Sequence, residues 1–586
     1  MSSATGDSAD HHDISSKLAV IDVSGGEVSS SSSSRKGPLV ELELPREKNL
    51  SDAAGLGLSV PDRLKFELPT TSGSNSPAVV GEVKVSPDAG VVTATTAASN
   101  DDKFDIFVDW LLENGAEFPS LYLRKYTESV RGVHASKDIL PYKPVLAVPH
   151  NCLITDKMGR VTELGRKVFG SHSYHLSVPN IIAVVIFMLT DREDENSFFK
   201  PYYDTLPSDW RNFPIFWDES ELEWLRGSKL VGDIAARKEN MRSDYDEVCR
   251  IAPEFAKYSF EEDFLPLRTA VGSRNFGIVV DGEKVTAMVP YADMLNHFRP
   301  RETSWTFNNA RNAFVITSLK TLVSGQQVMD SYGKKCNSKF LLHYGFAIES
   351  NREEDGKCQN EVVVRVGLDD DDAGDEALNA RKRAFVGASR AFRTFRLSMN
   401  HDDRHTADCL SFMRICAATH QEMDVIVGGD SSYRRSSSSV GFLNPRNERG
   451  ALEMLAKVCK KRLISYPQTM DENIATRDSG AAVAFSNRRT ALLVVLGEQE
   501  ILTFWSGVSD TVGHLLAKCS NDDEVQMTTP RDAIEAFDAR KALENDLKSL
   551  PRNNHAEKDM ARYARSIAVA HSRRGSNHHR TTFSRE

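Results

Sequence analysis

The sequence predicts an α+β fold in its first half, a mostly α-helical domain behind it, and disordered segments at both ends. A β-like run from Gly277 to Val289 is followed by a span that reads as two strands and a turn. Residues 175–260 are helical in pattern, and apolar residues recur at helical spacing along 452–463. Mixed helix and strand signals followed by helical signals alone indicate an α+β domain with a helical neighbour.

The chain has 586 residues, which exceeds one ordinary domain, so two folded units plus tails are expected. Residues 1–100 are rich in Ser, Gly, Asp and Ala and contain few large apolar residues, which predicts a disordered tail. From Pro551 to the end the chain is basic and rich in His, and we expect a second disordered tail there. Between the tails we expect a first domain at 101–348, with a helical insertion at about 175–260, and a helical domain at 349–550.

Charge and cysteine content narrow the class of protein. The formal net charge of −10 disfavours broad nucleic-acid binding, which requires a basic face, so no nucleic-acid partner is expected. The eight cysteines form no Cys-x-x-Cys pair. Neither a disulfide scaffold nor a Cys-rich zinc cluster is therefore indicated.

No targeting or membrane segment stands out. The longest strongly apolar piece is Ile181–Leu189, which is shorter than the ~18 residues that a membrane helix needs and indicates a buried helix. Acidic residues at 7, 10 and 13 and the lack of an apolar segment near the N-terminus disfavour a signal or transit peptide. We expect a soluble protein of the cytoplasm and/or nucleus, without a membrane partner, and a plastid location is not supported.

The elements follow in order from residue spacing. Phe107, Trp110, Leu111 and Leu112 predict a first helix that ends at Asn114-Gly115. Arg131–Ala135 and Pro144–Pro149 indicate strands. In the C-terminal third, one apolar stripe ends before Tyr466-Pro467 and consists of Leu452, Leu455, Ala456, Cys459 and Leu463.

Four short motifs occur in a fixed order: Ser273-Arg274, Asp293-x-x-Asn296-His297, Tyr332-Gly333 and Tyr344-Gly345-Phe346. Each is weak alone, because an Asn-His pair is usually turn chemistry and a Tyr before a Gly usually ends a strand. As an ordered set they resemble the SET-domain methyltransferases, most closely the branch typified by the Rubisco large-subunit lysine methyltransferase. Residues 197–207, with their Pro-Tyr and Leu-Pro pairs, resemble the helical insertion of that family, and the C-terminal helices resemble its substrate-binding domain.

The resemblance implies small β-sheets around a threaded, pseudoknot-like core. It implies S-adenosylmethionine as the cofactor and a lysine of a non-histone protein as the acceptor. The missing zinc cluster fits the non-histone branch. Methyl transfer to an amine is an in-line displacement that requires no metal, and its acceleration comes mainly from positioning and from fixed dipoles. The expected partner is a protein substrate, and we expect a monomer.

The resemblance implies cofactor contacts at individual positions of this sequence. The implied residues are Ser129, Val130, Arg131, Arg274, Asn296, His297 and Tyr332. The turn at 129–131 departs from the family pattern, which often has an acidic residue and a second Gly there. Arg274 is expected to pair with the cofactor carboxylate by charge-assisted hydrogen bonds; a surface ion pair is the alternative.

Tyr332 is the expected catalytic residue. Its phenol could hydrogen-bond the target nitrogen, and its ring could face the methylsulfonium. An unperturbed phenol, with a pKa of ~10, is a poor base at neutral pH, so solvent reached through the channel is the expected proton acceptor. The residues implied to contact substrate are Arg274, Phe276, Asp293, Trp305 and Tyr344, with helix capping the alternative for Asp293 and core packing for Tyr344.

Two positions indicate whether the methyl acceptor is a lysine or a histidine. A relative that methylates a histidine of actin has an Asn two residues after the motif Arg and a Trp before the motif Asp. This chain has Phe276 and Ala292 there, as the lysine enzymes do. A second Arg of the Rubisco-directed enzymes is replaced by Ile278, so a protein other than Rubisco is expected. The alternatives are the actin-type histidine methyltransferase and a catalytically silent SET fold that binds a partner.

Overall fold

The computed structural model describes residues 102–126, 130–368, 375–387, 392–428, 440–518 and 530–582. These residues belong to one compact unit that begins at Asp102. The predicted disordered tail at 1–100 lies outside the described residues, as does Ser129.

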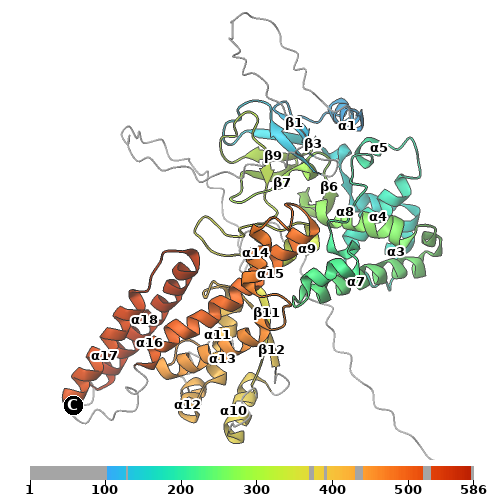
Figure 1. The fold of residues 1–586 in the computed structure, drawn as a ribbon. Coiled ribbons are helices and arrows are strands. Elements are labelled where there is room, and N and C mark those ends of the chain that lie inside the picture. Colours follow the sequence, from blue (N-terminus) through green and yellow to red (C-terminus); the bar gives the residue numbers. More distant parts are fainter. Residues whose placement is uncertain are drawn as a thin grey trace, which may run out of the picture. The chain divides into compact units, whose positions relative to one another are not determined.

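Short strands in the first part of the chain form four small sheets within the described residues (Figure 1). Two antiparallel strands, β1 (Leu121–Lys125) and β2 (Arg131–Ala135), follow helix α1 (Asp102–Glu113). One sheet has the order β3-β9-β8, with β3 at Pro144–Pro149, β8 at Thr303–Asn308 and β9 at Ala313–Ser318. Another has the order β4-β6-β5, with β4 at Ile154–Thr155, β5 at Phe276–Val280 and β6 at Glu283–Met288. The fourth pairs β7 (Asn296–His297) with β10 (Met329–Asp330) in parallel.

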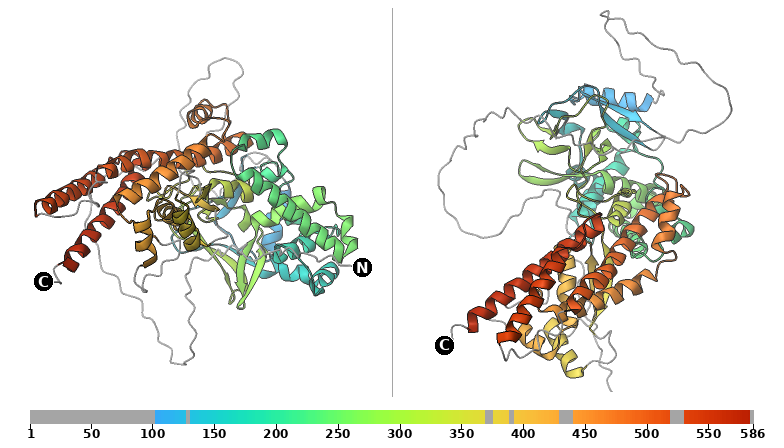
Figure 2. Two further views of the ribbon diagram at one scale, coloured as in Figure 1. Left: turned by 90° about the horizontal axis from the view of Figure 1, so that it is seen from below. Right: turned by 60° about the vertical axis from the view of Figure 1, so that its left-hand side comes forward.

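The helical insertion is longer than the predicted range of about 175–260, because every element between β4 and β5 is helical. Its α-helices are α2 (Asp156–Val161), α3 (Glu163–Gly170), α4 (Pro179–Asp191), α5 (Lys200–Tyr203), α6 (Glu219–Leu222), α7 (Leu230–Ile251) and α8 (Leu265–Arg274). The predicted helix at Ile181–Leu189 lies within α4, which begins at a proline and buries most of its side chains. Figure 2 shows these helices in cyan and green beside the strands. Helix α8 ends at Arg274, so the insertion delivers that side chain to the site.

Where the structure describes it, the C-terminal part is helical apart from one antiparallel pair, β11 (Val362–Gly367) with β12 (Phe392–Leu397). Its helices are α9 (Asn337–Tyr344), α10 (Glu376–Val386), α11 (Arg404–Cys416), α12 (His420–Gly428), α13 (Pro445–Leu463), α14 (Met470–Asp478), α15 (Asn487–Val508), α16 (His514–Ala517), α17 (Pro530–Lys548) and α18 (His555–Thr582). The predicted stripe lies on α13, where Leu452, Leu455 and Cys459 are fully buried. The α+β prediction with a helical second half is confirmed.

The prediction of a disordered tail from Pro551 was wrong for residues 555–582. Helix α18 covers this stretch and lies beside α17 (Figures 1 and 2). Tyr563, Ala564 and Ile567 are buried in the C-terminal core. These residues lie on one helical face, but the surrounding Arg, His and Ser residues hide the pattern in the sequence.

Residues Asn487–Ala517, which include α15, are long and apolar enough to cross a membrane by length and composition. In the structure 83% of their most apolar window is buried, so α15 is the central helix of the C-terminal core. Its Glu498 accepts hydrogen bonds from Ser228 in the insertion (2.7 Å) and from Tyr466 (2.6 Å), which ties the insertion to the helical part.

Candidate active site

A two-residue parallel ladder brings the Asn-His segment beside the Tyr-Gly segment. Asn296 pairs with Met329 and His297 with Asp330. The backbone N–H of Tyr332 then donates to Nδ1 of His297 at 2.8 Å, and the two ring centroids are 5.2 Å apart. Residues that are 35 positions apart in the chain therefore form one site.

The backbone ahead of Asp293 adopts an uncommon conformation. Tyr291 has a φ of 73°, in the left-handed region that bulky residues rarely adopt. Its ring is fully buried and stacks on Phe118, with the centroids 4.3 Å apart. Packing thus holds the strained turn, and the following 3₁₀ turn at Ala292–Met294 directs Asp293 toward Arg274. Backbone strain of this kind concentrates at functional sites.

The Tyr332 phenol is fixed on both sides. Its hydroxyl donates to the carbonyl oxygen of Leu295 at 2.7 Å, and its ring stacks on Tyr344 with the centroids 5.0 Å apart. Desolvation raises the pKa of Tyr332 above its ordinary value. The hydroxyl therefore keeps its proton at neutral pH, and the lone pairs of its oxygen can accept a hydrogen bond from an incoming N–H group.

His297 is a neutral imidazole. Burial, together with the positive charges of Arg299 and Lys335, lowers its pKa to about 3. Because Nδ1 accepts the Tyr332 N–H, the ring proton lies on Nε2. That Nε2 is buried and has no hydrogen-bond partner within the protein. His297 can therefore hold Tyr332 and donate one hydrogen bond, but it cannot serve as a base near neutral pH.

Arg274 and Asp293 form an ion pair inside the site. Nη1 of Arg274 donates to the backbone oxygen of Asp293 at 3.0 Å and to its Oδ2 at 3.2 Å. Tyr202 donates its hydroxyl to the same Oδ2 at 2.9 Å. The Asp293 side chain is fully buried. Helix capping was the alternative for Asp293, but Asp293 caps no helix. A surface ion pair was the alternative for Arg274, but the ion pair that it forms is not on the surface.

Arg131, the first residue of β2, contacts the Asn-His segment through its backbone. The side-chain amide of Asn296 donates to the backbone oxygen of Arg131 at 2.8 Å. Val130 is exposed. The guanidinium of Arg131 lies 5.3 Å from the centroid of the Phe104 ring.

Phe276 and Trp305 form an aromatic wall. Their ring centroids are 5.4 Å apart, edge to face, and both rings pack on Phe314. Phe276 follows Arg274 by two residues, which joins this wall to the Arg274–Asp293 pair. Nδ2 of the neighbouring Asn275 donates to the Val271 carbonyl at 2.8 Å and to the Gly272 carbonyl at 3.4 Å, both at the end of α8.

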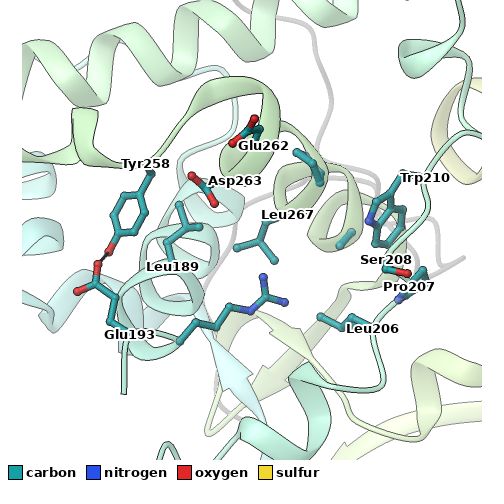
Figure 3. Close-up of a pocket in the computed structure, with 13 residues that line it drawn as sticks. Leu189, Glu193, Leu206, Pro207, Ser208, Trp210, Tyr258, Glu262, Asp263 and Leu267 are labelled. Carbon is teal, nitrogen blue, oxygen red and sulfur yellow. Dashed lines mark hydrogen bonds between the residues drawn. The ribbon is translucent and has the colours of Figure 1, made fainter. Parts of the chain in front are cut away.

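A separate pocket of about 370 Å³ lies on the helical insertion (Figure 3). Its lining includes Arg192, Glu193, Trp210, Tyr258 and Asp263. The Tyr258 hydroxyl donates to Glu193 at 2.6 Å. None of the site residues predicted from sequence lines this pocket.

Two residues of the site were not predicted. Tyr202 belongs to the segment that resembles the family's helical insertion, and its hydroxyl donates to Asp293. Asp330 lies on β10 opposite His297, and burial raises its pKa to about 6. The Pro201-Tyr202 pair that resembles the family insertion could have indicated Tyr202, whereas no sequence signal separates Asp330 from an ordinary strand-end acid.

Residues 374–502 match the family model described as Rubisco LSMT substrate-binding, within the range predicted for the helical domain. The chain is similar to the actin-histidine N-methyltransferase of Homo sapiens, at 26% identity over 428 residues, which covers 70% of this chain and 69% of the human protein. The protein of the same name in Gallus gallus is 25% identical over 423 residues, covering 69% and 68%.

Two solved structures share the fold. The SET domain of LSMT bound to lysine and AdoHcy superposes with a TM-score of 0.56 at 19% identity, covering 75% of this chain and 99% of that chain. Rubisco LSMT bound to AdoMet gives a TM-score of 0.54 at 19% identity, covering 74% and 99%. The predicted resemblance is thus confirmed. This chain shares the fold of the LSMT structures over about three quarters of its length, and its residues 374–502 match the Rubisco LSMT substrate-binding family model.

Proposed function

We propose that this protein is an S-adenosylmethionine-dependent N-methyltransferase that modifies a lysine side chain of a non-histone protein. The observation that carries the proposal is the Tyr332 phenol, held by the Leu295 carbonyl and stacked on Tyr344 beside a neutral His297. The cofactor, when bound, supplies a methyl group activated by its bond to a sulfonium. The residues of this chain must then hold that molecule and align the acceptor nitrogen with it.

The polar atoms of the site fit such a cofactor. Nitrogens of Arg131, Arg274 and His297, and Oδ1 of Asp293, are buried without hydrogen-bond partners in the protein. Unpartnered buried polar groups cost free energy and call for an explanation at each site. A ligand with a carboxylate, an ammonium group and a purine offers partners to both kinds of group. The presence of AdoMet and AdoHcy in the LSMT structures supports the same choice.

The acceptor amine must reach the site uncharged. Tyr332 can accept a hydrogen bond from the amine and so orient its lone pair, while the faces of Tyr332 and Tyr344 suit a neighbouring cation. Neither Tyr332 nor His297 can take the proton at neutral pH, since their pKa shifts, both caused mainly by burial, are in the wrong directions. Since neither residue can take the proton of the acceptor amine, we expect the amine to release that proton to solvent.

Lysine is favoured over histidine by the aromatic wall. A lysine stem requires apolar contact, which Phe276 and Trp305 supply. An imidazole requires a hydrogen-bond partner for its second ring nitrogen, and Phe276 supplies none. The second candidate is a protein-histidine methyltransferase, favoured by the similarity to actin-histidine N-methyltransferases.

The test uses the purified full chain, cofactor with a labelled methyl group, and cell extract, with purified actin in a parallel reaction. The modified residue is located by mass spectrometry, and Tyr332→Phe serves as the background. Label on a lysine ε-amine supports the proposal, and label on an imidazole selects the second candidate. Absence of both label and cofactor binding would assign the chain to the catalytically silent SET folds.

A further inference from the structure

Arg131 places a second guanidinium in the site, and the proposed function has not assigned it to any group of the cofactor. Arg131 is the first residue of β2, and its backbone oxygen accepts the Asn296 amide at 2.8 Å. Its guanidinium lies 5.3 Å from the centroid of the Phe104 ring on α1. The backbone of Arg131 is therefore tied to the Asn-His segment, and its side chain lies beside an aromatic face.

The charge of Arg131 has no counterpart of its own. Asp293 is the neighbouring carboxylate, and its Oδ2 already receives Arg274 and Tyr202. No ion pair joins Arg131 to an acidic side chain in the part of the chain that the structure describes. Two guanidinium groups and one carboxylate leave one positive charge in excess.

The unpartnered nitrogens of Arg131 have a defined geometry. Nε and Nη2 are both buried and without partners, and so is Nε of Arg274. Nε and Nη2 lie on the same edge of the guanidinium plane, which is the edge that binds a carboxylate through two parallel hydrogen bonds. Burial and the positive charge of Arg274 lower the pKa of Arg131 to about 10, which still leaves it charged at neutral pH. A buried guanidinium with two unpartnered N–H donors on one edge is suited to bind an anionic ligand.

We propose that the Arg131 side chain, together with Arg274, binds the α-carboxylate of the cofactor, and that Arg131 sets the preference of this site for ligands that carry that carboxylate. The inference rests on the proposed function, because it deepens the binding of the same cofactor. It assigns to the side chain of Arg131 a contact in addition to the backbone hydrogen bond from Asn296. It also explains how the altered turn at 129–131 remains compatible with cofactor binding.

The experiment measures binding rather than turnover. Isothermal titration of the full chain compares S-adenosylhomocysteine, which has the carboxylate, with 5′-methylthioadenosine, which shares the adenosine and thioether but lacks the amino-acid end. The variants are Arg131→Met, Arg131→Lys and, as a matched control, Arg124→Met. Arg124 is an exposed arginine on β1, at the position paired with Gly132.

For Arg131→Met we expect the affinity for S-adenosylhomocysteine to fall about tenfold to a hundredfold, the usual effect of losing a charge-assisted hydrogen bond. The affinity for 5′-methylthioadenosine should stay within about twofold, which also shows that the variant is folded. The affinity of Arg131→Lys for S-adenosylhomocysteine should lie between those of wild type and Arg131→Met, and the affinity of Arg124→Met should match that of wild type.

Three results would overturn the inference. Equal losses for both ligands would mean that Arg131 supports the fold. Unchanged affinity for both would mean that the carboxylate does not contact it. Tighter binding by Arg131→Met would mean that the side chain obstructs the site. In each of these cases wild type still binds S-adenosylhomocysteine and the proposed function stands, whereas absence of binding by wild type would remove the proposed function and the inference together.

Discussion

Tyr332 and His297 divide their tasks by protonation state. Burial moves the pKa of the phenol up and that of the imidazole down, so both groups are neutral over the ordinary pH range. Neither exchanges a proton, and each keeps a fixed hydrogen-bond pattern: the phenol donates to Leu295, and Nδ1 accepts from Tyr332. The sequence could predict these residues through the ordered motifs, but it could not predict the tautomer, which depends on one backbone N–H that folding brings to Nδ1.

Tyr332→Phe removes the hydroxyl while keeping the stacked ring. We expect kcat to fall at least about tenfold, since a preorganised polar contact in the transition state is lost, while binding of S-adenosylhomocysteine changes little. Tyr344→Phe is the matched control, because it removes a phenol from the partner ring of the same stack. Similar losses in both variants would indicate that turnover depends on both phenol hydroxyls and not on that of Tyr332 in particular. Single-turnover rates and calorimetry make the comparison.

Asp330 should make stability depend on pH. Burial raises its pKa to about 6 in the folded protein, above the ordinary carboxyl value, so folding favours the protonated form. Its contribution is therefore most favourable below about pH 4 and is lost as pH rises through about 6, at a cost of roughly 3 kcal/mol. Asp330→Asn should raise the free energy of unfolding at pH 7.5 and have a smaller effect at pH 4.5. Urea denaturation at both values tests this, with the exposed Asp281→Asn as control.

Among the elements, the shortest ones position the site. β7 and β10 have two residues each, too few for any alternation pattern, so periodicity could not have predicted their pairing. Long apolar helices such as α4 and the stripe of α13 were predictable because many residues repeat one spacing. The Tyr202–Asp293 hydrogen bond joins residues 91 positions apart, a contact that no local pattern reports.

Helix α9 carries Tyr344 and depends on the glycine that ends it. Gly345 has a φ of +75°, and a Cβ there would lie 2.4 Å from Nδ2 of Asn212. Gly345→Ala should lower the free energy of unfolding by about 2 kcal/mol through strain and this clash, and it should reduce activity by displacing Tyr344. Gly282→Ala is the matched control, because Gly282 has a φ of +86° with open space around it and should cost about 1 kcal/mol. Equal costs at the two positions would argue against the clash.

In the molecule as a whole, the last helix completes the second core. Helix α18 places Tyr563 against Glu448 on α13, and Glu448 also accepts two hydrogen bonds from Arg414 at 2.7 and 2.8 Å. All three side chains are buried. Composition predicted a disordered tail here because basic and polar residues surround the apolar face, which shows that the spacing of a few buried residues outweighs the average character of a segment.

Tyr563→Phe tests this connection. The buried Glu448 would lose one donor but keep Arg414, so we expect a loss of about 1–3 kcal/mol in the free energy of unfolding. Tyr142→Phe, at an exposed tyrosine, should have no measurable effect. Chemical denaturation compares the two. An unchanged midpoint for Tyr563→Phe would mean that α18 contributes little to the stability of the C-terminal core.

The ladder between β7 and β10 has a consequence for the order in which the protein acquires activity during synthesis. The ribosome synthesises the Asn-His segment more than thirty residues before Tyr332. The rings that pack on Tyr332, from α9 and Phe346, are synthesised later still. The nascent polypeptide therefore passes through a long interval in which half of the site has no counterpart. If the proposed function holds, methyl transfer can begin only after these segments have come together, so the first turnover reports that folding of this region is complete.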